Sequence, residues 1–147
     1  MDTGTTRPAR PEDVEAPAEL RAVAMRPDLE RLGRHDEQRV RQRLRNGHAP
    51  GHTSVVVVDG GIAGTLTLRP AEGGLRLENF CLSPALQPRG TGGAVLRTLL
   101  ARADRAGAAV RLDVLRGTVA RALHERHGFT TERQDPVDVF MVRTPVS

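Results

Sequence analysis

The stretch 75–107 constrains the fold of this chain more than any other. It reads LRLENFCLSPALQPRGTGGAVLRTLLARADRAG, which is a strand pattern, a proline-flanked loop with three glycines, and an amphipathic helix. Gly90, Gly92 and Gly93 allow a positive φ and a close approach of a ligand to the backbone. The helix that follows would direct its unpaired N–H groups and its positive dipole end at the loop. This succession suits a phosphate or pyrophosphate.

The rest of the chain predicts short strands and helices around this stretch. Strands are expected at 6–9, 53–58, 62–68, 75–82, 109–115, 129–133 and 137–142, and helices at 14–25, 36–46, 93–106 and 118–127. Asp13 and Asp36 are the expected N-caps, and Gly107 and Gly128 the expected C′ residues. The side chains expected to face inward from the helices include Leu20, Val23, Val40, Leu44, Leu96, Leu99, Val119 and Leu123.

These elements predict an α/β (α+β) fold, in the order β-α-α-β-β-β-α-β-α-β-β. The chain has 147 residues, which suits a single domain, 1–147, with one core. Short turns join the strands at 53–58, 62–68 and 75–82 into an antiparallel meander. A helix connects 75–82 to 109–115, so these two strands should be parallel. Because 109–115 shows little alternation, we expect it to be buried on both faces.

Composition excludes several classes of protein. There is no lysine, so a Walker P-loop is excluded. A net charge of +4, with no Trp or Tyr and only three Phe, does not favour nucleic-acid binding. The lone Cys81 and the lack of a signal peptide or long apolar run favour a soluble cytoplasmic protein that has no membrane contact. The five histidines show no ligand spacing, so no metal is expected.

The segment 28–46 carries Arg39, Arg41, Arg43 and Arg45 around a narrow apolar stripe. Two interpretations stay open at this point. The helix has a solvated basic face, or it forms the basic wall of a cleft that attracts an acidic partner.

Two motifs in the sequence resemble those of the GCN5-related N-acetyltransferase (GNAT) superfamily, and the resemblance covers nearly the whole chain. The first is the Gln/Arg-x-x-Gly-x-Gly/Ala signature, which here reads Gln87-Pro88-Arg89-Gly90-Thr91-Gly92, after Leu82-Ser83-Pro84. The second is the Ala-x-x-Leu-Tyr-Glu-x-x-Gly-Phe run, which here reads Ala120-Arg121-Ala122-Leu123-His124-Glu125-Arg126-His127-Gly128-Phe129. Each motif alone is moderately specific, whereas the two at family spacing form a strong signal.

The resemblance implies a mixed, mostly antiparallel sheet with splayed fourth and fifth strands, flanked by helices, that binds acetyl-CoA or another acyl-CoA. The pyrophosphate would sit on the backbone amides from Gln87 to Gly92, next to Gly93, with Gln87 and Arg89 closing over it. Pantetheine would pair with the backbone near Cys81 and Leu82.

Two positions depart from the family pattern. The family Asn after the fifth strand corresponds to Gly117, so a side-chain hydrogen bond to the cofactor is lost, although the neighbouring Thr118 is placed to replace part of it. The family Tyr corresponds to His124.

The resemblance implies direct acyl transfer to an amine, which needs a base, an oxyanion donor and a route for the thiolate to leave. Glu78 is the candidate base, and the alternative is a sheet-face charge paired with an arginine. His124 is the candidate acid, because an imidazolium titrates near ~6.5; activity would then fall as pH rises through this pKa. The alternative for His124 is a packing role. Cys81 is expected to be a small buried residue rather than a nucleophile. Asp113 faces the cofactor or pairs with an arginine.

Two rival functions differ in class from an N-acetyltransferase. A dinucleotide-binding unit would use Gly90 and Gly92, with Asp113 as a ribose ligand, but the third glycine position is Val95 and a meander of three antiparallel strands precedes the loop. An inactive acyl-CoA-binding sensor or interaction module of the same fold is the second rival, which Gly117 and His124 keep open. The acceptor, a small-molecule or peptide amine, is not identified by the sequence. The oligomeric state is also open, and dimers are common among similar proteins.

Overall fold

The predicted strands and helices are present in the computed structural model, which adds two short 3₁₀ helices. It describes residues 4–146, and of residues 87–89 the backbone alone. The elements are β1 (Thr5–Pro8), η1 (Pro11–Asp13), α1 (Glu15–Arg31), α2 (Glu37–Gly47), β2 (Thr53–Val58), β3 (Gly61–Ala71), β4 (Gly74–Leu82), η2 (Pro84–Arg89), α3 (Thr91–Arg105), β5 (Val110–Leu115), α4 (Ala120–Arg126), β6 (Thr130–Gln134) and β7 (Asp138–Arg143). Their order confirms the predicted one.

The strands form one seven-stranded mixed sheet in the order β1-β2-β3-β4-β5-β7-β6. β2 runs antiparallel to β1 and β3, and β7 runs antiparallel to β5 and β6. β4 and β5 are parallel, as predicted, and are paired through Leu75↔Val110 and Arg76↔Arg111 at the start of both strands. The α/β fold class is therefore confirmed.

The chain divides into two compact units. The first contains the chain up to Leu68 together with Glu78–Thr91, and the second contains Arg69–Leu77 with the chain from Gly92 onward. The divisions fall inside β3, inside β4 and after Thr91, the first residue of α3, so β3 and β4 belong to both units and α3 from Gly92 onward belongs to the second. A single domain over 1–147 remains a prediction.

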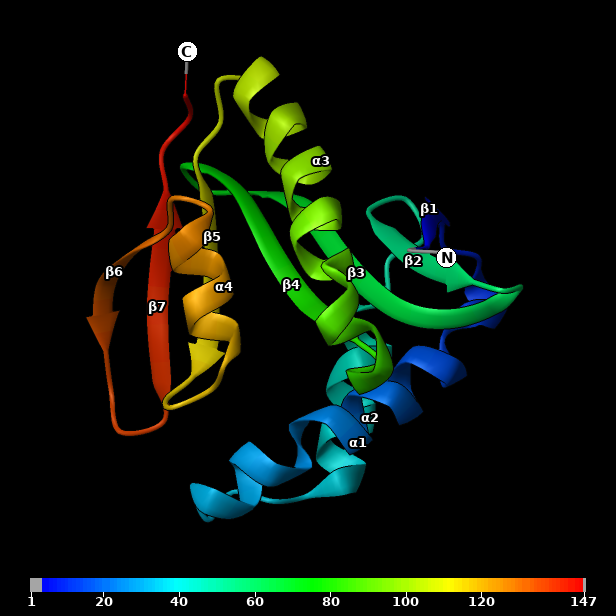
Figure 1. The fold of residues 1–147 in the computed structure, drawn as a ribbon. Coiled ribbons are helices and arrows are strands. Elements are labelled where there is room, and N and C mark those ends of the chain that lie inside the picture. The colour runs from blue at the N-terminus through cyan, green and yellow to red at the C-terminus, as the bar shows by residue number, and fades with distance from the viewer. Residues whose placement is uncertain (1–3, 147) are drawn as a thin grey trace. The chain divides into compact units, whose positions relative to one another are not determined.

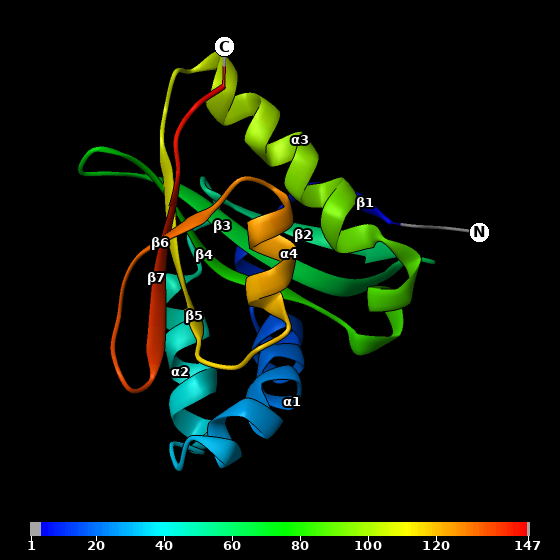
Figure 2. The ribbon, with the colours of Figure 1, turned by 60° about the vertical axis from the view of Figure 1, so that its left-hand side comes forward.

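In the first unit, α1 and α2 lie side by side (Figures 1 and 2). The Asp36 carboxylate accepts a hydrogen bond from the Arg39 N–H and caps α2, and Val40 and Leu44 are buried, as predicted. Arg41 and Arg45 donate to Glu19 and Glu15 of α1.

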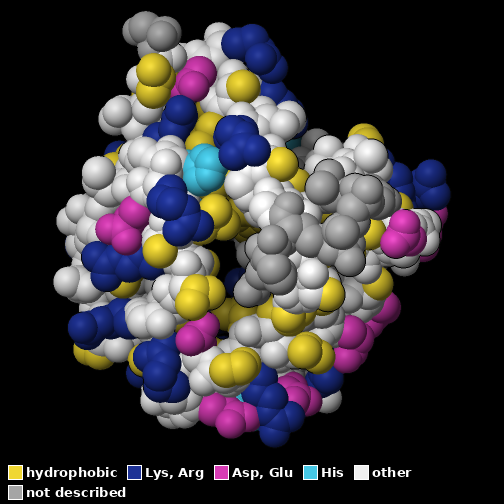
Figure 3. Space-filling view, viewed as in Figure 1, with side chains coloured by type: hydrophobic (Ala, Val, Ile, Leu, Met, Phe, Trp, Pro, Cys, Tyr) yellow, Lys and Arg dark blue, Asp and Glu magenta, His cyan; other side chains and the backbone are white. Residues whose placement is uncertain are grey.

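The carboxylates of α1 thus neutralise part of the positive charge of α2. Over these two helices, acidic and basic side chains adjoin one another in Figure 3. This favours the solvated, ion-paired face over a basic wall.

Helix α1 differs from its prediction in its cap, its length and its buried face. Asp13 does not cap this helix: its carboxylate accepts from the Arg7 guanidinium and from the Arg10 N–H, and these bonds lower its pKa to about 2. α1 also continues through Pro27 to Arg31. Val23 is 65% exposed, so its predicted burial is wrong. The buried stripe runs through Ala18 and Ala22, and the next residue along a helix points about 100° away.

In the second unit, α4 lies over one face of β5, β6 and β7 (Figures 1 and 2). Gly107 and Gly128 follow α3 and α4 with φ of 64° and 93°, which confirms both predicted C′ residues. Val119 is 77% exposed, against its prediction, because it occupies the N-cap position, before the helical stripe begins.

The prediction that β5 is buried on both faces is also wrong. Val110 and Leu112 are buried, whereas Arg111 between them is half-buried and Asp113 is exposed. The charged Arg111 and Asp113 thus alternate with the two buried residues, which is the pattern of a strand buried on one face.

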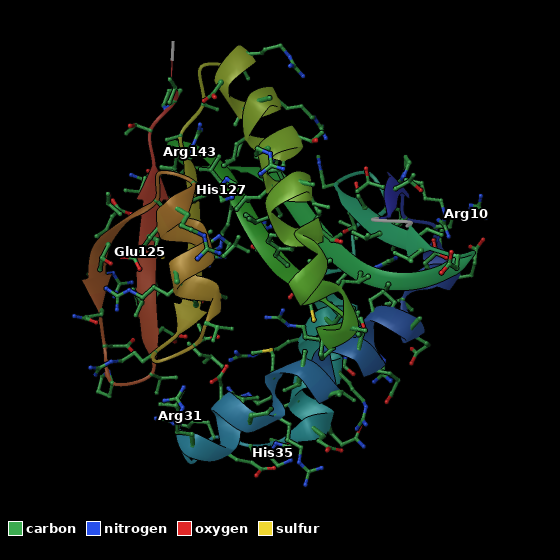
Figure 4. All side chains as sticks on the ribbon, in the orientation of Figure 1. Arg10, Arg31, His35, Glu125, His127 and Arg143 are labelled. Atoms are coloured by element: carbon green, nitrogen blue, oxygen red, sulfur yellow. The ribbon has the colours of Figure 1, made fainter. Side chains whose placement is uncertain are left out.

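Arg143, at the end of β7, holds the second unit together. Its guanidinium donates two hydrogen bonds to Asp104 of α3, at 2.8 and 3.0 Å, and a third to the His127 carbonyl at the end of α4, at 3.1 Å. Figure 4 shows His127 and Arg143 next to each other. Arg143 is only 9% exposed, and its bonds are the first cause that lowers the pKa of Asp104 to about 2.

We expect Arg143→Met to lower the melting temperature by roughly 5–10 °C, because it leaves the His127 carbonyl without its partner and the Asp104 carboxylate with the Val146 N–H but no neutralising charge. The matched control is Arg111→Met, which removes an equally bidentate but exposed pair with Glu132. That variant should shift the midpoint by less than about 2 °C. Equal shifts in thermal unfolding would contradict the role given to Arg143.

Candidate active site

The glycine loop forms a tight connection between two helical segments. After η2 the chain turns at Gly90, which has φ 72° and ψ 14°, and α3 begins at Thr91. Gly90 alone of the three glycines requires the left-handed conformation, because Gly92 and Gly93 already belong to the first turn of α3. The turn thus places a helix start, with its unpaired N–H groups, directly after the loop.

The side chains near this helix start are described only in part. Thr91 is 1% exposed, and its hydroxyl has no hydrogen-bond partner among the described residues. The side chains of Gln87 and Arg89, which were predicted to close over the phosphates, lie outside the described residues, as does that of Pro88.

The end of β4 is held by a bulge in β3. The register between β2 and β3 shifts after Val56↔Gly64, and the Ser83 N–H just beyond β4 donates to the Ala63 carbonyl. A Cβ on Gly64 would lie 2.4 Å from the Leu82 side chain and 3.0 Å from the Cys81 carbonyl, so only glycine fits there. This role of Gly64 could not be predicted, since no local signal in the sequence marks a strand glycine as a packing site.

Cys81 lies in the interior. Burial raises the pKa of its thiol, and its relative exposure is 8%. A thiol that resists ionisation fits the predicted apolar role better than a nucleophilic one.

Glu78 and Asn79 lie at the C-terminal end of α2. A Cβ on Gly47 would be 2.7 Å from the Asn79 amide nitrogen and 3.9 Å from a Glu78 carboxylate oxygen. Asn79 has φ 54°, a conformation rare for residues other than glycine. This interrupts the extended backbone of β4 between Glu78 and Phe80.

Asp113 pairs with an arginine, which favours an ion-pairing role over the alternative of facing the cofactor. Its carboxylate accepts from the Arg76 guanidinium across the parallel β4–β5 pair. The exposed residue thus stabilises strand pairing within the second unit.

His124 is buried in the second unit. It is 4% exposed, and its ring meets Phe129 edge-on with centroids 5.4 Å apart. Desolvation, followed by the charge of His127, lowers the pKa of His124 to about 4. The expectation of an imidazolium that titrates near neutral pH is corrected: at pH 7 this ring is neutral.

Gly117 forms the turn after β5. Its φ is 77°, a left-handed conformation that glycine adopts without strain. The Thr118 hydroxyl accepts from the Ala120 N–H at 3.4 Å, so it contributes to the start of α4.

A family model described as the acetyltransferase (GNAT) family matches residues 16–129. The chain belongs to this family. The match contains every site residue discussed above. No curated protein matches the chain.

Solved structures share the GNAT fold at low sequence identity. The PaiA N-acetyltransferase from Thermoplasma acidophilum, in complex with coenzyme A, has a TM-score of 0.78 at 18% identity, with 98% of this chain and 99% of that chain covered. PH1933 from Pyrococcus horikoshii OT3 has a TM-score of 0.77 at 20% identity, with 98% of this chain and 99% of that chain covered. The ribosomal-protein-S18-alanine N-acetyltransferase from Escherichia coli has a TM-score of 0.73 at 17% identity, with 98% of this chain and 96% of that chain covered.

The buried His124 predicts how stability depends on pH. Its folded-state pKa is about 4, against 6.5 for the free side chain, so the unfolded chain binds the extra proton. The free energy of unfolding should therefore fall as pH decreases from 6.5 to 4, by about 3 kcal/mol in total.

We expect His124→Leu to flatten this dependence in urea unfolding between pH 6.5 and 4. This pH window lies above the folded-state pKa of Asp104, which is about 2, so the Asp104 carboxylate stays ionised in the folded protein. Identical slopes for the wild type and the variant would show that His124 is not held neutral in the fold.

Proposed function

We propose that this protein is an acyl-CoA-dependent N-acyltransferase that transfers an acetyl group from acetyl-CoA to a primary amine by direct attack. The observation that carries the proposal is the turn at Gly90, which leads into α3 within a chain of the GNAT family. An acyl-CoA would supply an activated acyl group as its thioester. The amine belongs to a small molecule or a peptide.

The backbone from Gln87 to Gly93 would hold the pyrophosphate. Its N–H groups at the start of α3 include several that the helix itself leaves unpaired, and the helix dipole favours an anion there. The Thr91 hydroxyl, buried without a described partner, would gain an acceptor. Cys81 and Leu82 would offer backbone groups to pantetheine, and Gly117, at the position of the family Asn, would offer the cofactor no side-chain hydrogen bond.

Glu78 would accept the proton that the ammonium group of the acceptor must lose. A carboxylate can do this directly or through a water molecule. The neutral His124 is not suited to protonate a departing thiolate as an imidazolium. A thiol pKa near ~8.5 makes the thiolate an adequate leaving group without a dedicated acid. We therefore propose a packing role for His124 beside the cofactor.

The alternative is an acyl-CoA-binding module of the same fold without turnover. The absence of a side chain at Gly117 and the low pKa of His124 are the observations that favour it. CoA binding fits both functions, whereas turnover fits only the enzyme.

The first test is thermal unfolding with acetyl-CoA, CoA or NAD. A ligand at about 100 times its Kd adds about 2.7 kcal/mol, which raises the midpoint by several degrees. We expect both CoA species to raise it and NAD to have no effect. If neither CoA species shifts the midpoint, the loop at Gly90 is not the proposed site.

Gly90→Ala and Gly33→Ala form a matched pair for the same assay. Both glycines have a positive φ, 72° and 69°, and open space where a Cβ would point. Each substitution strains the backbone by about 1–2 kcal/mol. Gly90→Ala should diminish the shift caused by CoA, and Gly33→Ala should keep it. A full CoA shift in Gly90→Ala would contradict the role of the turn.

Glu78→Gln tests the base by release of free thiol from acetyl-CoA with a panel of amines. We expect kcat to fall roughly 100-fold or more, with unchanged CoA binding. Glu72→Gln, in the exposed turn before β4, is the control. Wild-type kcat in Glu78→Gln would reject the base role. If the wild type releases no thiol with any amine, the binding module is favoured.

A further inference from the structure

A cluster of cations lies over the first turn of α3 in the second unit. A Cβ on Gly93 would lie 3.3 Å from a terminal guanidinium nitrogen of Arg97 and 3.5 Å from His127 Nε2. Both groups thus converge on one point of the helix surface. Arg97 is one turn further along α3, and helical side chains lean toward the N-terminus, which brings its guanidinium back over Gly93.

Arg126 and Arg143 add to the positive field at this point. Their charges, with that of Arg97 and after the larger effect of burial, lower the pKa of His127. Arg143 is neutralised by Asp104. In the part of the chain that the structure describes, no carboxylate pairs with Arg97 or Arg126, and both are exposed.

This cluster differs from the arginine ion pairs of the second unit. Arg76, Arg111, Arg121 and Arg143 each pair with a carboxylate. Like charges held together without a counter-ion repel one another, and an arriving anion relieves this repulsion. Guanidinium and imidazole groups donate charge-assisted hydrogen bonds to phosphate oxygens.

We propose that Arg97 and His127, assisted by Arg126, form a subsite for a phosphomonoester, and that its ligand is the 3′-phosphate of CoA. The proposal rests on the proposed function, since the pyrophosphate of the same molecule would occupy the start of α3. A second phosphate on the ribose would then meet the cations beside the first turn. The subsite makes the protein select CoA over 3′-dephospho-CoA.

The test is isothermal titration of the wild type with CoA and with 3′-dephospho-CoA. We expect CoA to bind about tenfold more tightly. Arg97→Gln should lose most of this preference and retain its affinity for dephospho-CoA. Arg102→Gln removes the same charge from an exposed position near the other end of α3 and should keep the preference.

The outcomes separate the two proposals. If the wild type binds neither compound, the proposed function fails and this subsite with it. If it binds both equally, or if Arg97→Gln weakens both alike, only the phosphomonoester subsite is rejected.

A second readout does not depend on the stability of a variant. CoA should raise the pKa of His127 in NMR titrations, because a bound phosphate favours the imidazolium, and dephospho-CoA should raise it less. Equal changes with the two ligands would overturn the assignment of the 3′-phosphate to His127.

Discussion

The hydrogen bonds of Arg143 fix the arrangement of the second unit. One buried guanidinium joins the last turn of α3, through Asp104, to the end of α4, through the His127 carbonyl. The same α4 terminus places the His127 ring over Gly93 in the first turn of α3. α3 is thus held near both ends by contacts that converge on β7 and α4. The helix start that serves as the candidate phosphate site therefore owes its position to a strand that contributes no ligand group.

His124 and His127 show how strongly the environment sets chemistry in this family member. They lie three residues apart around α4, yet one packs on Phe129 and is neutral at pH 7, while the other faces Arg97, Arg126 and Arg143. Removal from water dominates at His124. At His127 both burial and neighbouring charge act. The first ring is suited to packing, and the second to the recognition of an anion.

The predictions that succeeded rest on local chemistry. Asp36 caps α2, and Gly107 and Gly128 end α3 and α4, because caps and C′ glycines act within one turn of the helix. The failures involve choices made by distant packing. Asp13 has the residue type of a cap, but Arg7 engages its carboxylate instead. Val23 and Val119 are apolar and yet exposed, because hydrophobicity alone does not set the direction in which a helix faces.

The sequence by itself determined the order of the elements, the parallel connection through α3, and the glycine turn at the candidate site, since these follow from periodicity, chain connectivity and the conformational freedom of Gly90. Only the tertiary structure decided which charges meet. It paired Asp113 with Arg76, Arg45 with Glu15, and left Arg97 beside His127. Ion pairs join residues far apart in the chain, and the sequence carries no local signal for such a partner. The pKa of His124 was decided in the same way, because burial is a property of the packed fold.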